Sequence, residues 1–191
     1  MLKLIKNRVN EHKKVVTNTI KKLEKKIYLC SEIIADALIK KKLIIWCGNG
    51  GSAADSMHLA AELIGKFDKI REPFRSISLA SNSPTLTCIS NDFGYENVFS
   101  RQIKGIGKKG DVLISISTSG NSPNINKAIK QAKSMDLKTI SFLGKKGGKC
   151  KNLSDLDLIV PSNSTARIQE MHIMIGHIVC EIVEKQTRYK F

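Results

Sequence analysis

The chain has 191 residues, which fits one compact domain and excludes a second domain of full size. Its hydrophobic fraction of 41% can fill a core, and its charged fraction of 26% is ordinary for a water-soluble protein. The net charge is +15, but the lysines are spread along the whole chain and no helix-turn-helix or zinc finger is visible. This favours anionic metabolites as partners and leaves nucleic acid as a minor alternative.

The first predicted element is a long amphipathic helix over residues 5–29. Its apolar residues recur at spacings of three, four and seven, which indicates one apolar stripe opposite a charged face: Val9, Val16, Ile20, Leu23 and Ile27. This stripe must be buried against the domain or against a partner subunit. Ser31 and Glu32 are typical of an N-cap and a first helical turn, so we expect a second helix that reaches about Lys40.

No apolar segment or cleavage site follows the basic N-terminal segment. We therefore expect neither a signal peptide nor a membrane anchor, and we expect a cytoplasmic protein. The five cysteines are odd in number, widely scattered and without a CxxC pair, which is typical of reduced thiols in that compartment.

Strands and helices alternate through the rest of the chain. The expected strands are Leu43–Cys47, Arg75–Leu79, Val112–Ile116, Thr139–Leu143 and Leu156–Val160. The expected helices are Ala53–Lys66, Tyr95–Lys104 after a turn at residues 91–94, Asn124–Met135 with Pro123 at its first position, and Thr165–Gln186. This alternation predicts an α/β fold in which a five-stranded parallel sheet is flanked by helices on both sides.

Two loops between a predicted strand and a predicted helix are built from Gly, Ser and Asn. They are GNGGS at Gly48–Ser52 and STSGNS at Ser117–Ser122. The first N–H groups of a helix lack internal partners and attract anions, glycine lets a ligand approach, and hydroxyls add donors. Ligands of parallel sheets also bind beyond the C-terminal ends of the strands. The two loops therefore predict a phosphate site, although GNGGS alone is equally consistent with a tight turn.

Neither loop fits the Walker A or GxGxxG pattern, which argues against nucleoside triphosphates and dinucleotides. The second loop is the more informative one, because it places four hydroxyl groups within six residues: Ser117, Thr118, Ser119 and Ser122. A purely structural turn does not need that many donors.

Two pairs of polar residues have helical spacing. His58 and Glu62 are four apart and share a helix face, whereas Gln169 and His177 are eight apart, about two turns. Together their imidazoles, carboxylate and amide could bind a divalent metal such as zinc. Taken separately, His58 with Glu62 could be a surface ion pair and His177 a core histidine. No HExxH motif is present, so the spacing does not by itself establish a metal site.

Four blocks in order along almost the whole chain resemble the phosphoheptose isomerases of the sugar-isomerase (SIS) domain superfamily: GNGGSAADSMHLAAEL, NDFGYENVFSRQ, STSGNS and ARIQEMHIMIGHIVCE. The resemblance implies isomerisation of D-sedoheptulose 7-phosphate to D-glycero-D-manno-heptose 7-phosphate, the first step toward activated heptose for lipopolysaccharide core or capsule. It implies a flavodoxin-like three-layer SIS domain over residues 31–191, with a helix over residues 1–30 for oligomer packing.

The resemblance also implies a role for individual residues. One Zn²⁺ per subunit would be bound by His58, Glu62, Gln169 and His177, and Glu62 with His177 would form the acid–base pair. The implied substrate contacts are Asn49, Gly50, Gly51, Ser52, Glu62, Asn91, Asp92, Ser117, Thr118, Ser119, Ser122 and Gln169. The family further implies a homotetramer with sites at subunit interfaces.

Aldose–ketose exchange needs a base that moves a proton between neighbouring carbons through an enediol. Glu62 is the expected proton carrier, zinc would polarise the carbonyl, and His177 would shuttle protons. The sequence departs from many relatives at Lys66, where they have arginine, and at residues 165–166, where some have aspartate before Arg167. Both departures affect how the sugar is bound rather than the class of reaction.

The sequence is also compatible with other functions. The fold is shared by non-enzymatic adaptors that bind the bacterial replication initiator, by sugar-phosphate-sensing modules, and by isomerases of arabinose or hexulose phosphates. The chain keeps Glu62 and His177, which the adaptors replace, and it shows no DNA-binding domain of the kind fused to the sensing modules. Among the isomerases, the intact set of His58, Glu62, Gln169 and His177 favours the heptose.

Overall fold

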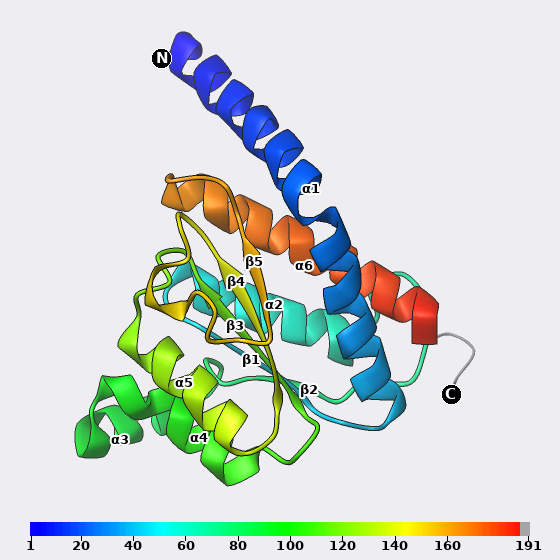
Figure 1. The fold of residues 1–191 in the computed structure, drawn as a ribbon, viewed down its shortest axis with the longest axis vertical. Helices are drawn as coiled ribbons and strands as arrows, with labels where there is room; N and C mark the ends of the chain where they lie inside the picture. Colours follow the sequence, from blue (N-terminus) through cyan, green and yellow to red (C-terminus); the bar gives the residue numbers. More distant parts are fainter. Residues whose placement is uncertain (188–191) are drawn as a thin grey trace.

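A parallel sheet of five strands forms the middle layer of the protein in the computed structural model, which describes residues 1–187 (Figure 1). The strands are β1 (Ile44–Gly48), β2 (Ser76–Ser78), β3 (Val112–Ser117), β4 (Lys138–Leu143) and β5 (Leu156–Ile159). Their order is β2-β1-β3-β4-β5, and every neighbouring pair is parallel. This is the flavodoxin-like order, so the predicted fold class is confirmed.

Helices cover both faces of the sheet. One face carries α1 (Leu2–Ile39), α2 (Gly51–Ile64) and α6 (Thr165–Thr187), and the other carries α3 (Ser83–Phe93), α4 (Val98–Ile106) and α5 (Pro123–Ser134). Each face has its own apolar core. The central strands β1 and β3 are buried along their whole length because helices cover both of their sides, which explains their continuous apolar sequence.

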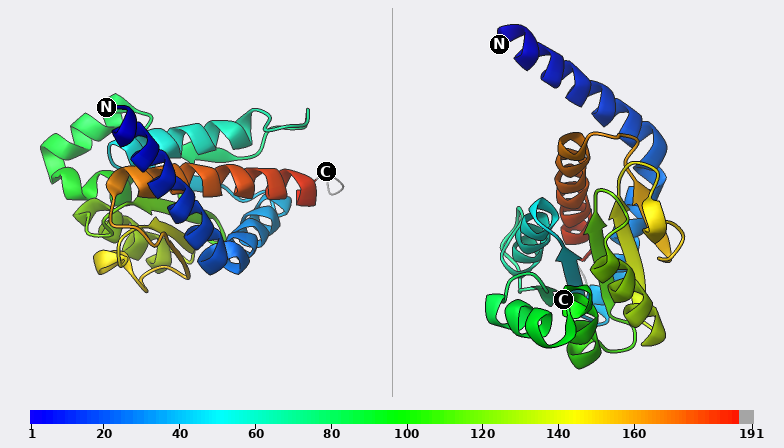
Figure 2. Two further views of the ribbon diagram at one scale, coloured as in Figure 1. Left: turned by 90° about the horizontal axis from the view of Figure 1, so that it is seen from above. Right: turned by 90° about the vertical axis from the view of Figure 1, so that its left-hand side faces the viewer.

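The first helix differs from the prediction. It is one continuous helix of 38 residues, because Ser31 is buried within it and its hydroxyl donates to the carbonyl of Ile27 instead of capping a new helix. From Val15 onward one side of the helix is buried against α6, although Val16 and Ile20 of the predicted stripe are only partly buried. The N-terminal part projects beyond the domain with Leu2, Ile5 and Val9 exposed (Figure 2).

The helix α3 was not predicted. The turn expected at residues 91–94 is wrong, because residues 91–93 belong to this helix and only Gly94 follows it. Asn82 caps this helix by accepting a hydrogen bond from the N–H of Thr85, and Gly94 ends it with a φ of +83°. Asn91 and Asp92 therefore lie in its last turn. The expected helix after them begins as a short 3-10 turn, Tyr95–Asn97, before α4.

The remaining predicted strands and helices are confirmed within three residues at each end. All five cysteines are free, and four of them are buried. The last four residues of the predicted domain, 188–191, lie outside the described residues. Within residues 1–187, no helix is both long and apolar enough to cross a membrane.

Candidate active site

The two glycine-rich loops lie side by side where the chain changes direction across the sheet. Strands β1 and β3 are neighbours, and Gly48 at the end of β1 pairs with Ile116 in β3. The chain leaves β1 into α2 on one face and leaves β3 into α5 on the opposite face. This is a topological switch point, where open parallel sheets bind ligands. The fold thus places both predicted phosphate loops at the favoured edge.

The last helix, α6, contacts the first loop at the start of α2. Gly50 has a φ of +54°, which favours glycine. A Cβ on Gly51 would lie 2.3 Å from Nε2 of Gln169, so the Gln169 amide of α6 lies directly against the loop. The next residue, Ser52, is buried. Glycine at position 51 therefore allows the contact between the first loop and Gln169.

Asn49 joins the two loops. Its Oδ1 accepts hydrogen bonds from the Tyr95 hydroxyl at 3.0 Å and from Nδ2 of Asn124 at 2.8 Å. Its Nδ2 donates to Oδ1 of Asn124 at 2.9 Å, which leaves one N–H of the amide for a ligand. Asn124 lies in the first turn of α5 and is only 2% exposed.

Sequence reasoning did not identify Tyr95 or Asn124 as residues of the site. A signal for Asn124 was present, because it shares a helix face with the core residue Ala128, and a buried amide needs a partner.

The second loop is held open by its own side chains. The Ser117 hydroxyl accepts the N–H of Gly120, and the Ser119 hydroxyl accepts the N–H of Asn121, both at 3.1 Å. A hydroxyl that accepts in this way keeps its own hydrogen for another acceptor. Ser117 and Ser122 approach to 3.5 Å between their oxygens. These serine hydroxyls are thus available to an anion at the start of α5.

A further loop, at residues 144–150, braces the second one. Gly120 has a φ of +65°, and a Cβ there would lie 1.9 Å from the carbonyl oxygen of Gly147. A main-chain hydrogen bond also joins the two loops: the N–H of Cys150 donates to the Gly120 carbonyl at 2.8 Å. The N–H of Lys149 donates to Oδ1 of Asn121 at 3.0 Å. The shape of the second loop therefore depends on a neighbour about 25 residues later in the chain.

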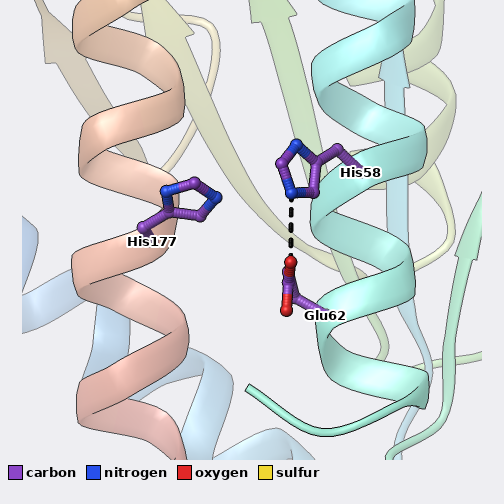
Figure 3. Close-up of side chains that lie close together, drawn as sticks. All are labelled: His58, Glu62 and His177. Atoms are coloured by element: carbon purple, nitrogen blue, oxygen red, sulfur yellow. Dashed lines mark hydrogen bonds and ion pairs between the residues drawn. The ribbon is translucent and has the colours of Figure 1, made fainter. Parts of the chain in front are cut away.

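The helices α2 and α6 bring three of the four predicted metal ligands together: His58, Glu62 and His177 (Figure 3). Nε2 of His58 lies 3.0 Å from Oε1 of Glu62, and the His58 and His177 rings are 5.0 Å apart between centroids. Gly176 allows this approach, because a Cβ there would lie 2.5 Å from the side chain of Leu59 on α2. The site is accessible: the His58 side chain is 49% exposed and that of Glu62 24%.

The idea that His177 is a core histidine is wrong, because His177 is only partly buried and faces His58. The core histidine of α6 is His172. Its Nε2 donates to the carbonyl of Leu143 at 3.0 Å, and its Nδ1 has no partner among the described residues. Burial lowers the pKa of His172 to about 4, although its bond to Leu143 acts in the opposite direction. His172 is therefore neutral near pH 7.

The donor atoms of His58, Glu62 and His177 fit a divalent metal. They lie within 4.8 Å of one another, and two imidazoles with a carboxylate are ligands that zinc uses. Two ligand atoms on one zinc ion are at most about 4 Å apart, so small side-chain rotations suffice. Gln169 lies two turns before His177 with its amide at Gly51, and its role as the fourth ligand stays a prediction.

Asn91 and Asp92 are exposed at the end of α3. The amide of Asn91 donates to the Asp92 carboxylate at 2.8 Å, and the thiol of Cys88 approaches the same carboxylate at 3.6 Å. In the described part of the chain, their side-chain hydrogen bonds join neither glycine-rich loop. Their contact with substrate stays a prediction.

Comparisons with known proteins agree with this geometry. The SIS domain family model matches residues 9–144. The phosphoheptose isomerase of Nitratiruptor sp. is 49% identical over 185 residues, 97% of this chain and 99% of that one. That of Clostridium acetobutylicum is 56% identical over 155 residues, 81% of this chain and 79% of that one.

The similarity extends to a solved structure. The phosphoheptose isomerase of Neisseria gonorrhoeae superposes with a TM-score of 0.90 at 36% identity, covering 96% of this chain and 98% of that one. The chain therefore belongs to the SIS domain family and, within it, to the phosphoheptose isomerase family.

Proposed function

We propose that the protein isomerises D-sedoheptulose 7-phosphate to D-glycero-D-manno-heptose 7-phosphate. The observation that carries the proposal is the meeting of Glu62, His58 and His177 beside two loops suited to a phosphate at the switch point. The phosphoheptose isomerases that cover nearly all of the chain support the same substrate. The product would enter the synthesis of activated heptose for lipopolysaccharide or capsule.

The chain's own residues suffice for the proton transfers. The Glu62 carboxylate would take a proton from the carbon beside the carbonyl and return it to the neighbouring carbon. His177, an imidazole within reach of the same space, would move protons to and from the sugar oxygens. The remaining N–H of the Asn49 amide would donate to a sugar oxygen, since its Oδ1 is already bonded twice.

The phosphate would bind at the second loop. The hydroxyls of Ser117, Thr118, Ser119 and Ser122 and the first N–H groups of α5 would donate to its oxygens. Gly50, Gly51 and Ser52 would contact the rest of the substrate, with Asn91 and Asp92 from α3. This arrangement would hold the phosphorylated end on the α5 side and the reacting carbons on the α2 side.

One zinc ion per subunit would be held by His58, Glu62 and His177, with Gln169 as fourth ligand. When bound, such an ion polarises the substrate carbonyl and stabilises the oxyanion that forms. Glu62 has two carboxylate oxygens, so one could bind the ion in place of its hydrogen bond to His58 while the other serves the proton transfer.

The proposed assembly is a homotetramer with active sites at subunit interfaces. Its support is the projecting part of α1, where Leu2, Leu4, Ile5 and Val9 are exposed and a groove of about 430 Å³ runs between α1 and the start of α6. Burial of such a stripe against a partner is favourable. The predicted boundary at residue 30 falls inside α1, so the proposed role of this helix in subunit packing concerns only its projecting part.

We propose a cytoplasmic location, which free cysteines suit.

The test is conversion of sedoheptulose 7-phosphate by purified, zinc-loaded protein, followed by detection of the aldose product. Arabinose 5-phosphate and a hexulose phosphate serve as competing substrates. Selective turnover of the heptose would support the proposal. Turnover of another phosphosugar would replace the substrate, and no turnover by a folded, zinc-loaded oligomer would favour the adaptor function.

A further inference from the structure

A buried ion pair lies beside the cluster of His58, Glu62 and His177. Nε of Arg71 is 3.0 Å from Oε1 of Glu184, and their side chains are only 13% and 7% exposed. Glu184 stands on α6 seven residues after His177, about two turns along the same side of the helix. A buried pair of charges is costly unless its other polar atoms are bonded, so the partners of both side chains matter.

Glu184 binds the loop that follows α2. Its carboxylate accepts three consecutive backbone N–H groups, from Phe67 at 3.4 Å and from Asp68 and Lys69 at 3.0 Å each. Burial would raise the pKa of Glu184, but these N–H groups and Arg71 outweigh it and leave the pKa below its usual value. The side chain is therefore ionised near neutral pH and fixes this loop to α6.

Arg71 binds the end of α2. Its Nη2 donates to the carbonyl of Glu62 and its Nη1 to the carbonyl of Leu63, both at 3.0 Å. Nη1 also donates to the carbonyl of Glu72, and the guanidinium lies over the Phe74 ring at 3.9 Å. The last carbonyls of a helix have no partner within it, so Arg71 supplies them from outside.

These contacts link the two helices of the candidate metal site. Glu62 carries its carboxylate into the site and its carbonyl to Arg71, which in turn is paired with Glu184 on α6. Phe67, whose N–H is bound by Glu184, packs its ring 5.8 Å from that of His177. The gap between α2 and α6 is thus fixed at Gly176 by close packing and beyond Glu62 by the ion pair.

We propose that Arg71 and Glu184 are positioning residues, which hold Glu62 and His177 at the separation that metal binding requires. The proposal rests on the proposed function, because it assumes the metal site of that enzyme. Neither residue is proposed as a ligand or a catalytic group: both act through the backbone of α2 and the loop at residues 66–72. Surrounding groups of this kind commonly change metal affinity by about 10–100-fold.

The experiment measures zinc affinity of the full-length protein by competition with a coloured chelator, together with the visible spectrum of the Co²⁺-loaded protein. The variants are Glu184→Gln, which keeps the shape and removes the charge, and Arg71→Lys, which keeps the charge and removes the fork that binds Glu62. The control is Asp155→Asn, since Asp155 also accepts a backbone N–H, from Thr139, and pairs with a lysine away from this site.

We expect both variants to bind zinc about 10–100-fold more weakly than the parent and to shift the Co²⁺ spectrum, while the control matches the parent. Circular dichroism at the same temperature checks that each protein is folded. If Glu184→Gln does not fold, the result for Arg71→Lys decides the test. Parent-like affinity and spectrum in folded variants would overturn the proposal and leave a purely stabilising pair. Failure of the parent itself to bind metal would instead overturn the metal site on which both proposals depend.

Discussion

The loops that leave β1 and β3 are both built from small polar residues and glycine and lie side by side, but they open very different helices. The first opens α2, which carries His58 and Glu62 toward α6. The second opens α5, which presents the apolar residues Ile125, Ala128 and Ile129 to the core. Loop composition thus locates a binding edge, whereas the helix that follows determines which chemistry is available there. Changes on the α2 side should lower kcat, and changes in the second loop should raise KM.

Among substitutions that test this difference between the two loops, Glu62→Gln should have the largest effect. Glutamine keeps the size of the side chain and an oxygen for His58, but it cannot accept the substrate proton. We expect kcat to fall by about 10³-fold with a nearly unchanged melting temperature. The control is Glu181→Gln, an exposed carboxylate on α6 that pairs with Lys185. Turnover by Glu62→Gln within tenfold of the parent would remove Glu62 from its role.

The second loop should respond mainly in substrate binding, and Gly120→Ala tests this. Alanine is strained at a φ of +65°, and its Cβ would lie 1.9 Å from the Gly147 carbonyl oxygen, so the loop must move. We expect KM to rise at least about tenfold, with a smaller change in kcat and a loss of stability of about 1–3 kcal/mol.

Gly105→Ala is a matched control for that substitution. Gly105 lies within α4, and a Cβ there would meet nothing within 4 Å. We expect an unchanged KM and a gain of stability of about 0.5–1 kcal/mol, measured by urea unfolding. Equal effects of the two substitutions on KM would argue against a phosphate site at the second loop.

Much of the fold could be predicted because burial on both faces leaves a clear pattern in the sequence. The run Leu43–Cys47 predicted β1 almost to the residue. The helix α3 was missed because only Ile89 of its residues is buried, which leaves little periodicity to detect. The break at Ser31 was wrong because a serine within a helix can bond to the preceding turn instead of capping the next one.

The site could be predicted only where its residues are neighbours along one helix. The spacing of His58 and Glu62 placed them together, but their meeting with His177 depends on the packing of Gly176 against Leu59, which no local pattern shows. That part of the prediction came from the resemblance. The burial of Asn124 could have been predicted, but its partner Asn49 is 75 residues away, so its place in the site could not.

The two sides of the site also meet inside the core, where His172 of α6 donates to Leu143 just before the bracing loop. Its folded pKa of about 4 lies below the unfolded value of about 6.5. The stability from neutral His172 is therefore complete above about pH 6.5 and declines as the pH falls toward 4, by ~3 kcal/mol at most.

Urea unfolding at pH 7, 5.5 and 4.5 measures this loss. His172→Gln should be less stable at pH 7 and should flatten the pH dependence. A parent-like slope in the His172→Gln variant would assign the acid sensitivity to other groups.

The smallest expected effect concerns the link between the loops. Tyr95→Phe removes one of the two hydrogen bonds to Oδ1 of Asn49 and leaves the pairing with Asn124. We expect a loss of about 1 kcal/mol or less, seen as a few-fold decrease in kcat/KM. Tyr28→Phe, at an exposed position on α1, is the control. A loss above 100-fold would indicate that the Tyr95 hydroxyl contacts the substrate itself.

The packing of the first helix on the last determines the order in which the chain can fold during synthesis. Leu23 and Ile27 of α1 share a core with Val179 and Val183 of α6, at opposite ends of the sequence. Until α6 leaves the ribosome, the side of α1 and the part of the sheet that α6 covers stay exposed, while the core beneath α3, α4 and α5 can already close. A premature stop before residue 165 would therefore yield an aggregation-prone fragment rather than a smaller stable domain.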